Sequence, residues 1–302
     1  MFSSYGADEA ALQISYTDAP PINVATAEHL LLEVKKIMDQ LEVPFFLRQG
    51  TCLGAIRDNA LITWDDDMDI GSIYGFDGVT EKKIETVASV FRENGYYAKI
   101  EHSDQSISVT MMKSSTRIDW NCYKIINDMI IHYPGVRIPA SLFDPLKEID
   151  FIGAKFFVPN PPEEYLRFKY GPEWVTPKKV GFEKDVLKLI SDAPAHGRLE
   201  KIKNFLGKHN LRWGAGKLRV LNHESKPIVG AEVRIAAVGS YRTNQLGYAN
   251  FYLPKDDWYA LVINHDDHEE VLYQEKMAPG KTYIYKPEHS NVAGRLCALL
   301  SE

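Results

Sequence analysis

The sequence predicts an α+β fold in which a mixed sheet with flanking helices is followed by a small all-β sandwich. Three observations lead to this prediction. The 302 residues suit two domains, helical and strand patterns alternate in the first part of the chain, and beyond about residue 218 the patterns are strands only. We therefore expect one domain at residues 1–213 and a second at 214–302, joined at Gly214-Ala215-Gly216.

The first domain is expected to alternate helices with strands. Apolar residues at helical spacing, from Leu30 to Leu41, predict a helix near residues 26–41. Thr80 precedes a second helical pattern, and Gly95 ends it. The expected strands lie at 45–47, around 68–70, at 106–112 and at 116–123.

The chain changes character at residues 167–217. This segment holds twelve Lys and Arg residues against five Asp and Glu, with helical spacing at 186–190 and 199–206. It fits either a solvated helical face or a contact with an anionic or lipid-linked acceptor at a membrane surface. After it, turn signals such as Gly239-Ser240 separate short apolar runs. These predicted strands lie at 218–221, 231–238, 248–253, 258–263, 270–274 and 282–285.

Composition and charge restrict the function classes. Apolar residues make up 45% of the chain and charged residues 25%, which excludes a mainly disordered protein. The net charge of −6 argues against a general nucleic-acid binder, which needs a basic face. We see no run of about twenty apolar residues and no signal-peptide pattern, and the three cysteines fit neither a disulfide scaffold nor a zinc spacing. We therefore expect a cytoplasmic protein with no transmembrane segment.

The strongest chemical signal is a run of acidic residues at 65–69. Asp67 and Asp69 are two positions apart, so on a strand both carboxylates project from one face. Carboxylates this close repel each other unless a cation lies between them. Hard oxygen ligands of this kind suit Mg²⁺ or Mn²⁺. Asp119, in the middle of a later predicted strand, is the candidate for a third ligand.

Other interpretations of this region fit less well. A solvated acidic loop has little use for the apolar residues Trp64, Met68 and Ile70 that interleave with the acids. An EF-hand loop beginning at Asp65 would need Gly and Glu where Ile70 and Phe76 stand. The glycines that precede the acids match neither a P-loop nor a dinucleotide-binding pattern. We expect them to form a turn that lets backbone amides approach a phosphate.

These motifs resemble a known family. Residues 50–57 read Gly-Thr-Cys-Leu-Gly-Ala-Ile-Arg, and residues 62–70 read Ile-Thr-Trp-Asp-Asp-Asp-Met-Asp-Ile. Together with Arg117–Trp120 and Tyr170–Pro177, they resemble the LicD/fukutin family of the nucleotidyltransferase-fold superfamily over about residues 26–180. The resemblance implies a nucleotidyltransferase-like mixed sheet. It also implies transfer of a phosphorylated group, such as phosphocholine or an alditol phosphate, from a CDP-linked donor to a glycan.

The resemblance and the residue chemistry together suggest roles. Asp67, Asp69 and Asp119 are expected to hold one or two divalent ions, and Asp119 could instead take the proton of the acceptor hydroxyl. Arg57 suits a bidentate phosphate contact, with a surface salt bridge as the alternative. Arg48 replaces the acidic or small residues common in the family and is expected to alter donor recognition. The expected donor-binding residues are Gly50, Thr51, Gly54, Arg57 and Arg48. The residues expected around the site are Asp65, Asp66, Trp174 and Thr176.

The second domain offers one competing cluster, His265 to Glu270, with two histidines and four acids. It fits a metal site or, as we expect, the polar tip of a hairpin between two strands. Residues 216–287 resemble carboxypeptidase-regulatory-like or transthyretin-like β-sandwich domains, on runs such as Pro227–Val233 and Thr243–Phe251. That resemblance implies only accessory binding or stabilisation.

The leading hypothesis is a metal-dependent transferase that modifies a glycan precursor, as in capsule or lipopolysaccharide synthesis. Its expected partners are a CDP-linked donor and a glycan or lipid-linked glycan acceptor, with no nucleic acid. Two alternatives stay open: nucleotidyl transfer to a small molecule or protein, and a binding protein with a decayed active site. The complete set of Asp67, Asp69 and Asp119 weighs against the last of these.

Overall fold

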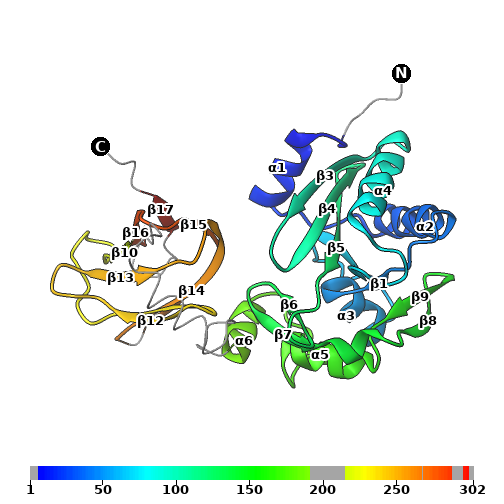
Figure 1. The fold of residues 1–302 in the computed structure, drawn as a ribbon. Helices are drawn as coiled ribbons and strands as arrows, with labels where there is room; N and C mark the ends of the chain where they lie inside the picture. The colour runs from blue at the N-terminus through cyan, green and yellow to red at the C-terminus, as the bar shows by residue number, and fades with distance from the viewer. Residues whose placement is uncertain (1–5, 191–214, 267, 288–294, 299–302) are drawn as a thin grey trace. The chain divides into compact units, whose positions relative to one another are not determined.

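The computed structural model describes residues 6–190, 215–266, 268–287 and 295–298. Contacts divide the chain into two compact units (Figure 1). The first unit comprises residues 1–132 and 137–179, and the second comprises residues 133–136 and 180–302.

The change of unit at residues 179/180 comes earlier in the chain than the sequence patterns suggested. Helix α6 (Phe182–Leu189) belongs to the second unit, where Arg234 Nη1 donates a hydrogen bond to the carbonyl of Leu187 at 3.1 Å. Residues 191–214 lie outside the described part of the chain. They include the expected boundary at 213/214 and the second helical pattern of the basic segment, at 199–206. Both stay predictions.

A seven-stranded mixed sheet forms the centre of the first unit, in the order β3-β4-β5-β2-β1-β9-β8. β2 runs parallel to β5 and β1 runs parallel to β9, while the other neighbouring pairs are antiparallel. The mixed sheet confirms the predicted fold class. The strands of this unit's sheet are β1 (Phe46–Leu47), β2 (Asp67–Ile73), β3 (Tyr97–His102), β4 (Ser106–Lys113), β5 (Thr116–Tyr123), β8 (Lys147–Phe151) and β9 (Ala154–Val158). A separate two-stranded sheet consists of β6 (Met129–His132) and β7 (Val136–Pro139).

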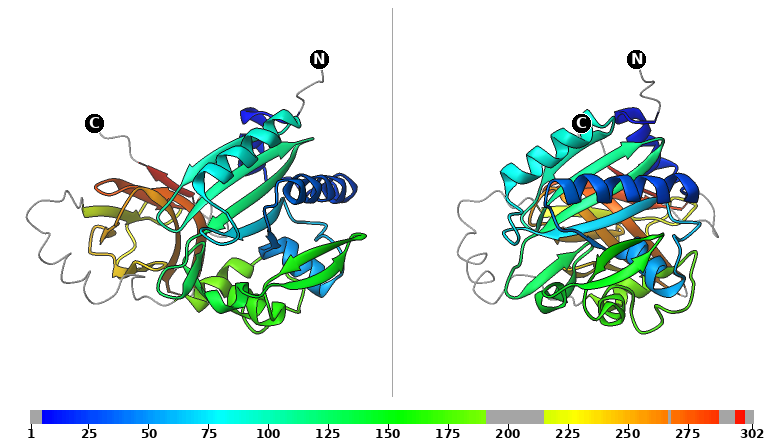
Figure 2. Two further views of the ribbon diagram at one scale, coloured as in Figure 1. Left: turned by 45° about the vertical axis from the view of Figure 1, so that its right-hand side comes forward. Right: turned by 90° about the vertical axis from the view of Figure 1, so that its right-hand side faces the viewer.

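Helices lie on both faces of the seven-stranded sheet. α2 and α4 cover one face and α1 lies on the other (Figure 1, Figure 2). The two helices predicted from spacing are confirmed: α2 is capped by Asn23, and the Thr80 side chain accepts a hydrogen bond from the amide of Lys83 at 3.3 Å at the start of α4. The helices are α1 (Glu9–Thr17), α2 (Val24–Gln40), α3 (Gln49–Arg57), α4 (Glu81–Glu93), α5 (Pro162–Tyr170) and the 3₁₀ helix Ala140–Phe143. Within the described residues, no helix has the length and apolar character needed to cross a membrane.

The expected glycine turn at residues 50–57 is wrong, because this segment is helix α3. Gly50 and Gly54 are four residues apart and therefore share one helix face. A Cβ at Gly50 would lie 2.0 Å from Oδ2 of Asp65, and one at Gly54 would lie 2.4 Å from the carbonyl oxygen of Ala60. The glycines thus allow the loop before β2 to pack directly on the helix, which sets where the acidic residues begin.

The second unit contains two four-stranded sheets, β13-β10-β16-β17 and β12-β11-β14-β15. Leu218 and Phe251 from the first sheet and Val233 and Leu261 from the second belong to one hydrophobic core, which agrees with the predicted sandwich. The predicted turn at Gly239-Ser240 is wrong, because these residues begin β12 and the chain reverses just before them. The strands are β10 (Ala215–Val220), β11 (Glu232–Ile235), β12 (Gly239–Arg242), β13 (Tyr248–Tyr252), β14 (Asp257–His265), β15 (His268–Met277), β16 (Thr282–Lys286) and β17 (Arg295–Ala298).

Candidate metal centre

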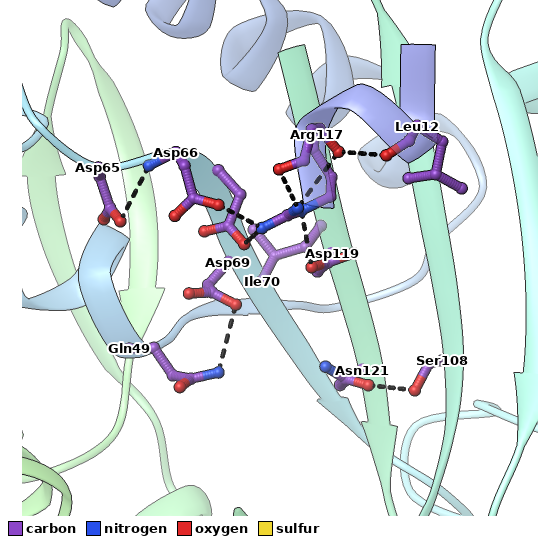
Figure 3. Close-up of polar contacts among 12 residues, drawn as sticks. Leu12, Gln49, Asp65, Asp66, Asp69, Ile70, Ser108, Arg117, Asp119 and Asn121 are labelled. Atoms are coloured by element: carbon purple, nitrogen blue, oxygen red, sulfur yellow. Dashed lines mark hydrogen bonds and ion pairs between the residues drawn. The ribbon is translucent and has the colours of Figure 1, made fainter. Parts of the chain in front are cut away.

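Five aspartates gather where β2 lies beside β5 (Figure 3). The parallel register sets Asp67 next to Arg117 and Asp69 next to Asp119, and strand alternation keeps these four side chains on one face. One oxygen from each of three carboxylates lies within 4.8 Å of the others in two overlapping groups. These groups are Asp67, Asp69 and Asp119, and Asp65, Asp66 and Asp67. The three residues predicted as metal ligands therefore meet, with the two predicted supporting aspartates beside them.

Arg117 lies inside this acidic cluster. Its Nη2 is 2.8 Å from Oδ2 of Asp66 and 2.5 Å from Oδ2 of Asp67, and its Nε is 3.4 Å from Oδ2 of Asp119. Only 6% of Arg117 is exposed. Sequence reasoning missed this residue, although its position two residues before Asp119 on a predicted strand implied that both would share a face.

Arg48 is buried beneath the cluster and is not exposed to a donor arriving from solvent. It is 2% exposed, its Nη2 is 2.5 Å from Oδ1 of Asp69, and its Nε donates to the carbonyl of Ile70 at 2.9 Å. The guanidinium also lies over the ring of Tyr123, 5.9 Å from its centroid. In this geometry Arg48 holds Asp69 in place, and a role of its side chain in donor recognition stays a prediction.

The first turn of α3 holds the other side of Asp69. The hydroxyl of Thr51 accepts a hydrogen bond from the backbone amide of Asp69 at 2.8 Å. Nε2 of Gln49 donates to Oδ1 of Asp69 at 3.3 Å, and the backbone amide of Gln49 donates to the hydroxyl of Tyr165 at 2.9 Å. Gln49 and Tyr165 gave no recognisable signal in the sequence. Gly50, which follows Gln49, packs against Asp65.

The remaining predicted donor residues lie farther along α3. Arg57 is in the last turn, about 12 Å of helix from the first turn, and pairs with the neighbouring Asp58 at 2.6 Å. The salt-bridge alternative for Arg57 is the one that the structure contains. Trp174 and Thr176 form local turns after α5, with backbone hydrogen bonds to Gly171 at 3.3 Å and to Glu173 at 2.9 Å.

Burial raises the pKa of several carboxyl groups in the cluster. Burial, together with the nearby Asp67, raises the pKa of Asp69 to about 8 although Arg48 opposes the shift. Burial raises the pKa of Asp119 to about 6, with Arg117 opposing and Asp67 adding to the shift. Burial and neighbouring carboxylates also raise the pKa of Asp65. Like charges gathered out of water are costly, so this site favours a bound cation.

A divalent ion fits the residues present. Oδ1 of Asp119 is buried and accepts no hydrogen bond, and a buried carboxylate oxygen of this kind is costly without a partner. The facing oxygens belong to Asp67 and Asp69, and an all-carboxylate set suits Mg²⁺ or Mn²⁺ better than a softer metal.

The histidine and acid cluster of the second unit lies at the expected hairpin. His265 of β14 is paired in register with His268 of β15, and their ring centroids are 5.0 Å apart. Within the described residues, these two histidines do not join any group of three ligand atoms within 4.8 Å. The hairpin interpretation therefore fits the structure better than the metal site.

Comparison with known proteins identifies the domain that carries the acidic cluster. Residues 42–161 match the family model described as LicD/FKTN/FKRP, nucleotidyltransferase domain. The ribitol 5-phosphate transferase FKRP of Mus musculus is 23% identical over 182 residues, which cover 57% of this chain and 36% of that protein. The corresponding human protein is 24% identical over 164 residues, covering 51% of this chain and 32% of that protein. An uncharacterized protein of Rickettsia typhi is 24% identical over 150 residues, or 48% of this chain and 45% of that protein.

The matched segments thus span between about a third and about half of the length of these relatives. Among solved structures, the antibiotic-resistance factor ANT(2'')-Ia covers 61% of this chain and 95% of its own, at 13% identity and a TM-score of 0.35. That likeness is too weak to support an argument. The match at residues 42–161 contains α3, β2 and β5, and hence all five aspartates. The part of the chain that matches the LicD/FKTN/FKRP nucleotidyltransferase family model is therefore the part that carries the acidic cluster.

Proposed function

We propose that this protein is a metal-dependent phosphotransferase. It would move a phosphorylated group of the phosphocholine or alditol phosphate type from a CDP-linked donor to a hydroxyl of a glycan or lipid-linked glycan. The new phosphate ester forms as the pyrophosphate bond breaks and CMP leaves. The observation that carries the proposal is the meeting of three carboxylates from β2 and β5 within 4.8 Å, one of which has a buried oxygen without a hydrogen bond. The family of the domain and its FKRP relatives support the reaction class.

In this mechanism Asp67, Asp69 and Asp119 hold Mg²⁺ or Mn²⁺. When bound, the ion supplies positive charge to the donor pyrophosphate. Arg48 and Thr51 keep Asp69 in position from two sides. Gly50 and Thr51 lie in the first turn of α3, where backbone amides have no partner within the helix and favour an anion such as a phosphate.

In the alternative role, Asp119 accepts the proton of the attacking hydroxyl and leaves the ion to Asp67 and Asp69. With no ion bound to it, burial raises the pKa of Asp119 to about 6, and a base works best when its pKa is near the working pH. The buried Oδ1 of Asp119 has no competing hydrogen bond. In this role Asp119 holds the proton until the product leaves.

A thermal-shift screen tests the proposal. CDP-ribitol, CDP-glycerol and CDP-choline are each added with Mn²⁺, with Asp67→Asn as the matched control. A donor at 100 times its Kd stabilises the folded protein by about 2.7 kcal/mol, which raises Tm by about 5–10 °C for a unit of this size. No rise with any donor would favour a binding protein that has lost its active site.

The mass of the product then distinguishes the two enzyme classes. A phosphotransferase adds the phospho-alcohol to the acceptor, whereas a nucleotidyltransferase, the activity for which the matched domain is named, adds a nucleotide. A glycan heavier by the phospho-alcohol supports our proposal. A nucleotide adduct contradicts it. The cytoplasmic location and the membrane contact through residues 167–217 stay predictions.

A further inference from the structure

Arg117 is held from two opposite sides. On one side its guanidinium contacts Asp66, Asp67 and Asp119. On the other side its Nη1 donates to both the carbonyl oxygen and the hydroxyl of Ser15, each at 3.2 Å. Figure 3 shows Arg117 between α1 and the aspartates. An exposed arginine side chain could adopt other rotamers away from the aspartates, whereas these contacts on two sides hold the Arg117 side chain against them.

Helix α1 completes the enclosure of Arg117. Ser15 is 4% exposed, and the ring of Tyr16 covers the guanidinium, with Cζ 4.7 Å from the ring centroid. Asp8 caps α1 by accepting from the amide of Ala11 at 2.8 Å. Just before the helix, the carbonyl of Gly6 accepts from the amide of Ser115 at 3.0 Å, which ties α1 to the turn before β5.

The charges of the cluster explain what Arg117 does there. Five carboxylates face two guanidinium groups, and Arg48 is committed to Asp69. Arg117 is nearer to Asp66 and Asp67, at 2.8 and 2.5 Å, than to Asp119, at 3.4 Å. Its charge therefore lies mainly where a cation bound by the group Asp65, Asp66 and Asp67 would be needed. The other group keeps the buried Oδ1 of Asp119 without a hydrogen bond. The two potential ion sites are therefore unequal.

We propose that Arg117 is a positioning residue that takes the place of a second metal ion. It holds Asp66 and Asp67, restricts the centre to one divalent ion at Asp67, Asp69 and Asp119, and is kept there by α1. This inference rests on the proposed function, because it concerns the metal site of that reaction. Beyond the proposed function, the inference states how many ions the centre binds, names Arg117 as the residue that sets this number, and gives α1 the role of holding Arg117.

Counting bound Mn²⁺ by electron paramagnetic resonance tests the inference without any turnover. The wild-type chain is expected to bind one Mn²⁺. Arg117→Gln should bind a second ion or bind the first at least about tenfold more tightly, since Coulomb's law gives about this factor for removing one nearby charge even in fully solvated surroundings. Arg117→Lys, which keeps the charge, should restore a single ion of wild-type affinity.

The matched control is Arg92→Gln. Arg92 is an exposed arginine of the same unit that donates to the carbonyl of Ala98 and, within the described part of the chain, pairs with no carboxylate. It should leave both the number of Mn²⁺ ions and their affinity unchanged. Two ions in the wild type, or an Arg117→Gln variant that binds Mn²⁺ like the wild type, would overturn the inference.

The outcomes also separate this inference from the proposed function. One Mn²⁺ in the wild type with no effect of Arg117→Gln refutes the role of Arg117 and leaves the metal-dependent transferase standing. No Mn²⁺ in either chain refutes both. If Arg117→Gln does not fold, Tyr16→Ala carries the test, because it removes the ring that covers the guanidinium and leaves the aspartates and Arg117 in the chain. It should tighten Mn²⁺ binding by a smaller factor, and unchanged binding would overturn the inference.

Discussion

Replacing Arg48 by methionine should destabilise the first unit strongly, because Arg48 neutralises a carboxylate that is itself buried. The ion pair joins Nη2 of Arg48 to Oδ1 of Asp69 at 2.5 Å, and the two side chains are 2% and 10% exposed. Methionine preserves the stem that packs against Gly71 but removes the charge and the hydrogen bond to Ile70. Removing one partner of a buried pair costs about 3–5 kcal/mol, a large fraction of a typical domain stability of about 5–15 kcal/mol.

A double-mutant cycle measures this interaction directly. Urea unfolding of Arg48→Met, Asp69→Asn and the double variant is followed by circular dichroism in metal-free buffer above pH 8, where Asp69 with its pKa of about 8 is ionised. It gives the three free energies of unfolding. The double variant should lose about 2 kcal/mol less than the sum of the single losses, because each single change already breaks the pair. Arg92→Met is the matched control. It breaks only hydrogen bonds to one carbonyl, so its cost should be about 1 kcal/mol and additive with Asp69→Asn.

A loss below about 1 kcal/mol for Arg48→Met, or strict additivity with Asp69→Asn, would refute the positioning role. In that case Arg48 would not depend on Asp69. A higher KM for the donor with unchanged stability would then support the direct donor contact that the sequence suggested.

Three further predictions concern the same unit. The free energy of unfolding of the metal-free wild type, relative to Asp69→Asn, should fall as pH rises from about 4 to about 8. The reason is that a pKa of about 8 makes Asp69 bind its proton more strongly in the folded state than in the unfolded state. Urea unfolding at several pH values checks this, and a constant difference contradicts it. Gly54→Ala should lower the free energy of unfolding of the first unit by about 1–3 kcal/mol in urea, because the new Cβ would lie 2.4 Å from the carbonyl oxygen of Ala60. Alanine usually stabilises a helix relative to glycine, so a stabilised variant would contradict this prediction. Tyr165→Phe should lower stability by about 1–3 kcal/mol, because it leaves the first amide of α3 without its acceptor; an unchanged Tm would show that this hydrogen bond is dispensable.

The ligand residues could be predicted from the sequence because their signal is local. Asp67 and Asp69 alternate with buried apolar residues, and that pattern requires only a strand. Their meeting with Asp119 could not be derived from the pattern alone, because β2 pairs in parallel with β5, and α4, β3 and β4 intervene in the sequence. The strand pattern offered Asp119 only as a candidate third ligand, and the resemblance to a family supported that choice.

The supporting residues were harder to predict because their roles depend on burial. The sequence suggested Arg48 for donor recognition, and only the packing beneath β2 shows that it pairs with Asp69. The glycines at 50 and 54 looked like a turn because glycine disfavours helices. Here the close approach of Asp65 and Ala60 outweighs that preference. The resemblance of residues 216–287 to known sandwich domains stays a prediction.

The most direct test of the central claim is the turnover of a folded Asp67→Asn variant. Asp67 belongs to both groups of carboxylates, so asparagine at this position removes one charge from the proposed ion site with little change of volume. With a CDP-linked donor and Mg²⁺ or Mn²⁺, we predict that transfer falls by more than about a hundredfold, the scale of several kcal/mol of lost metal catalysis, while circular dichroism shows a retained fold. Near-full turnover by the folded variant would contradict the assignment of this site as the metal centre of the reaction.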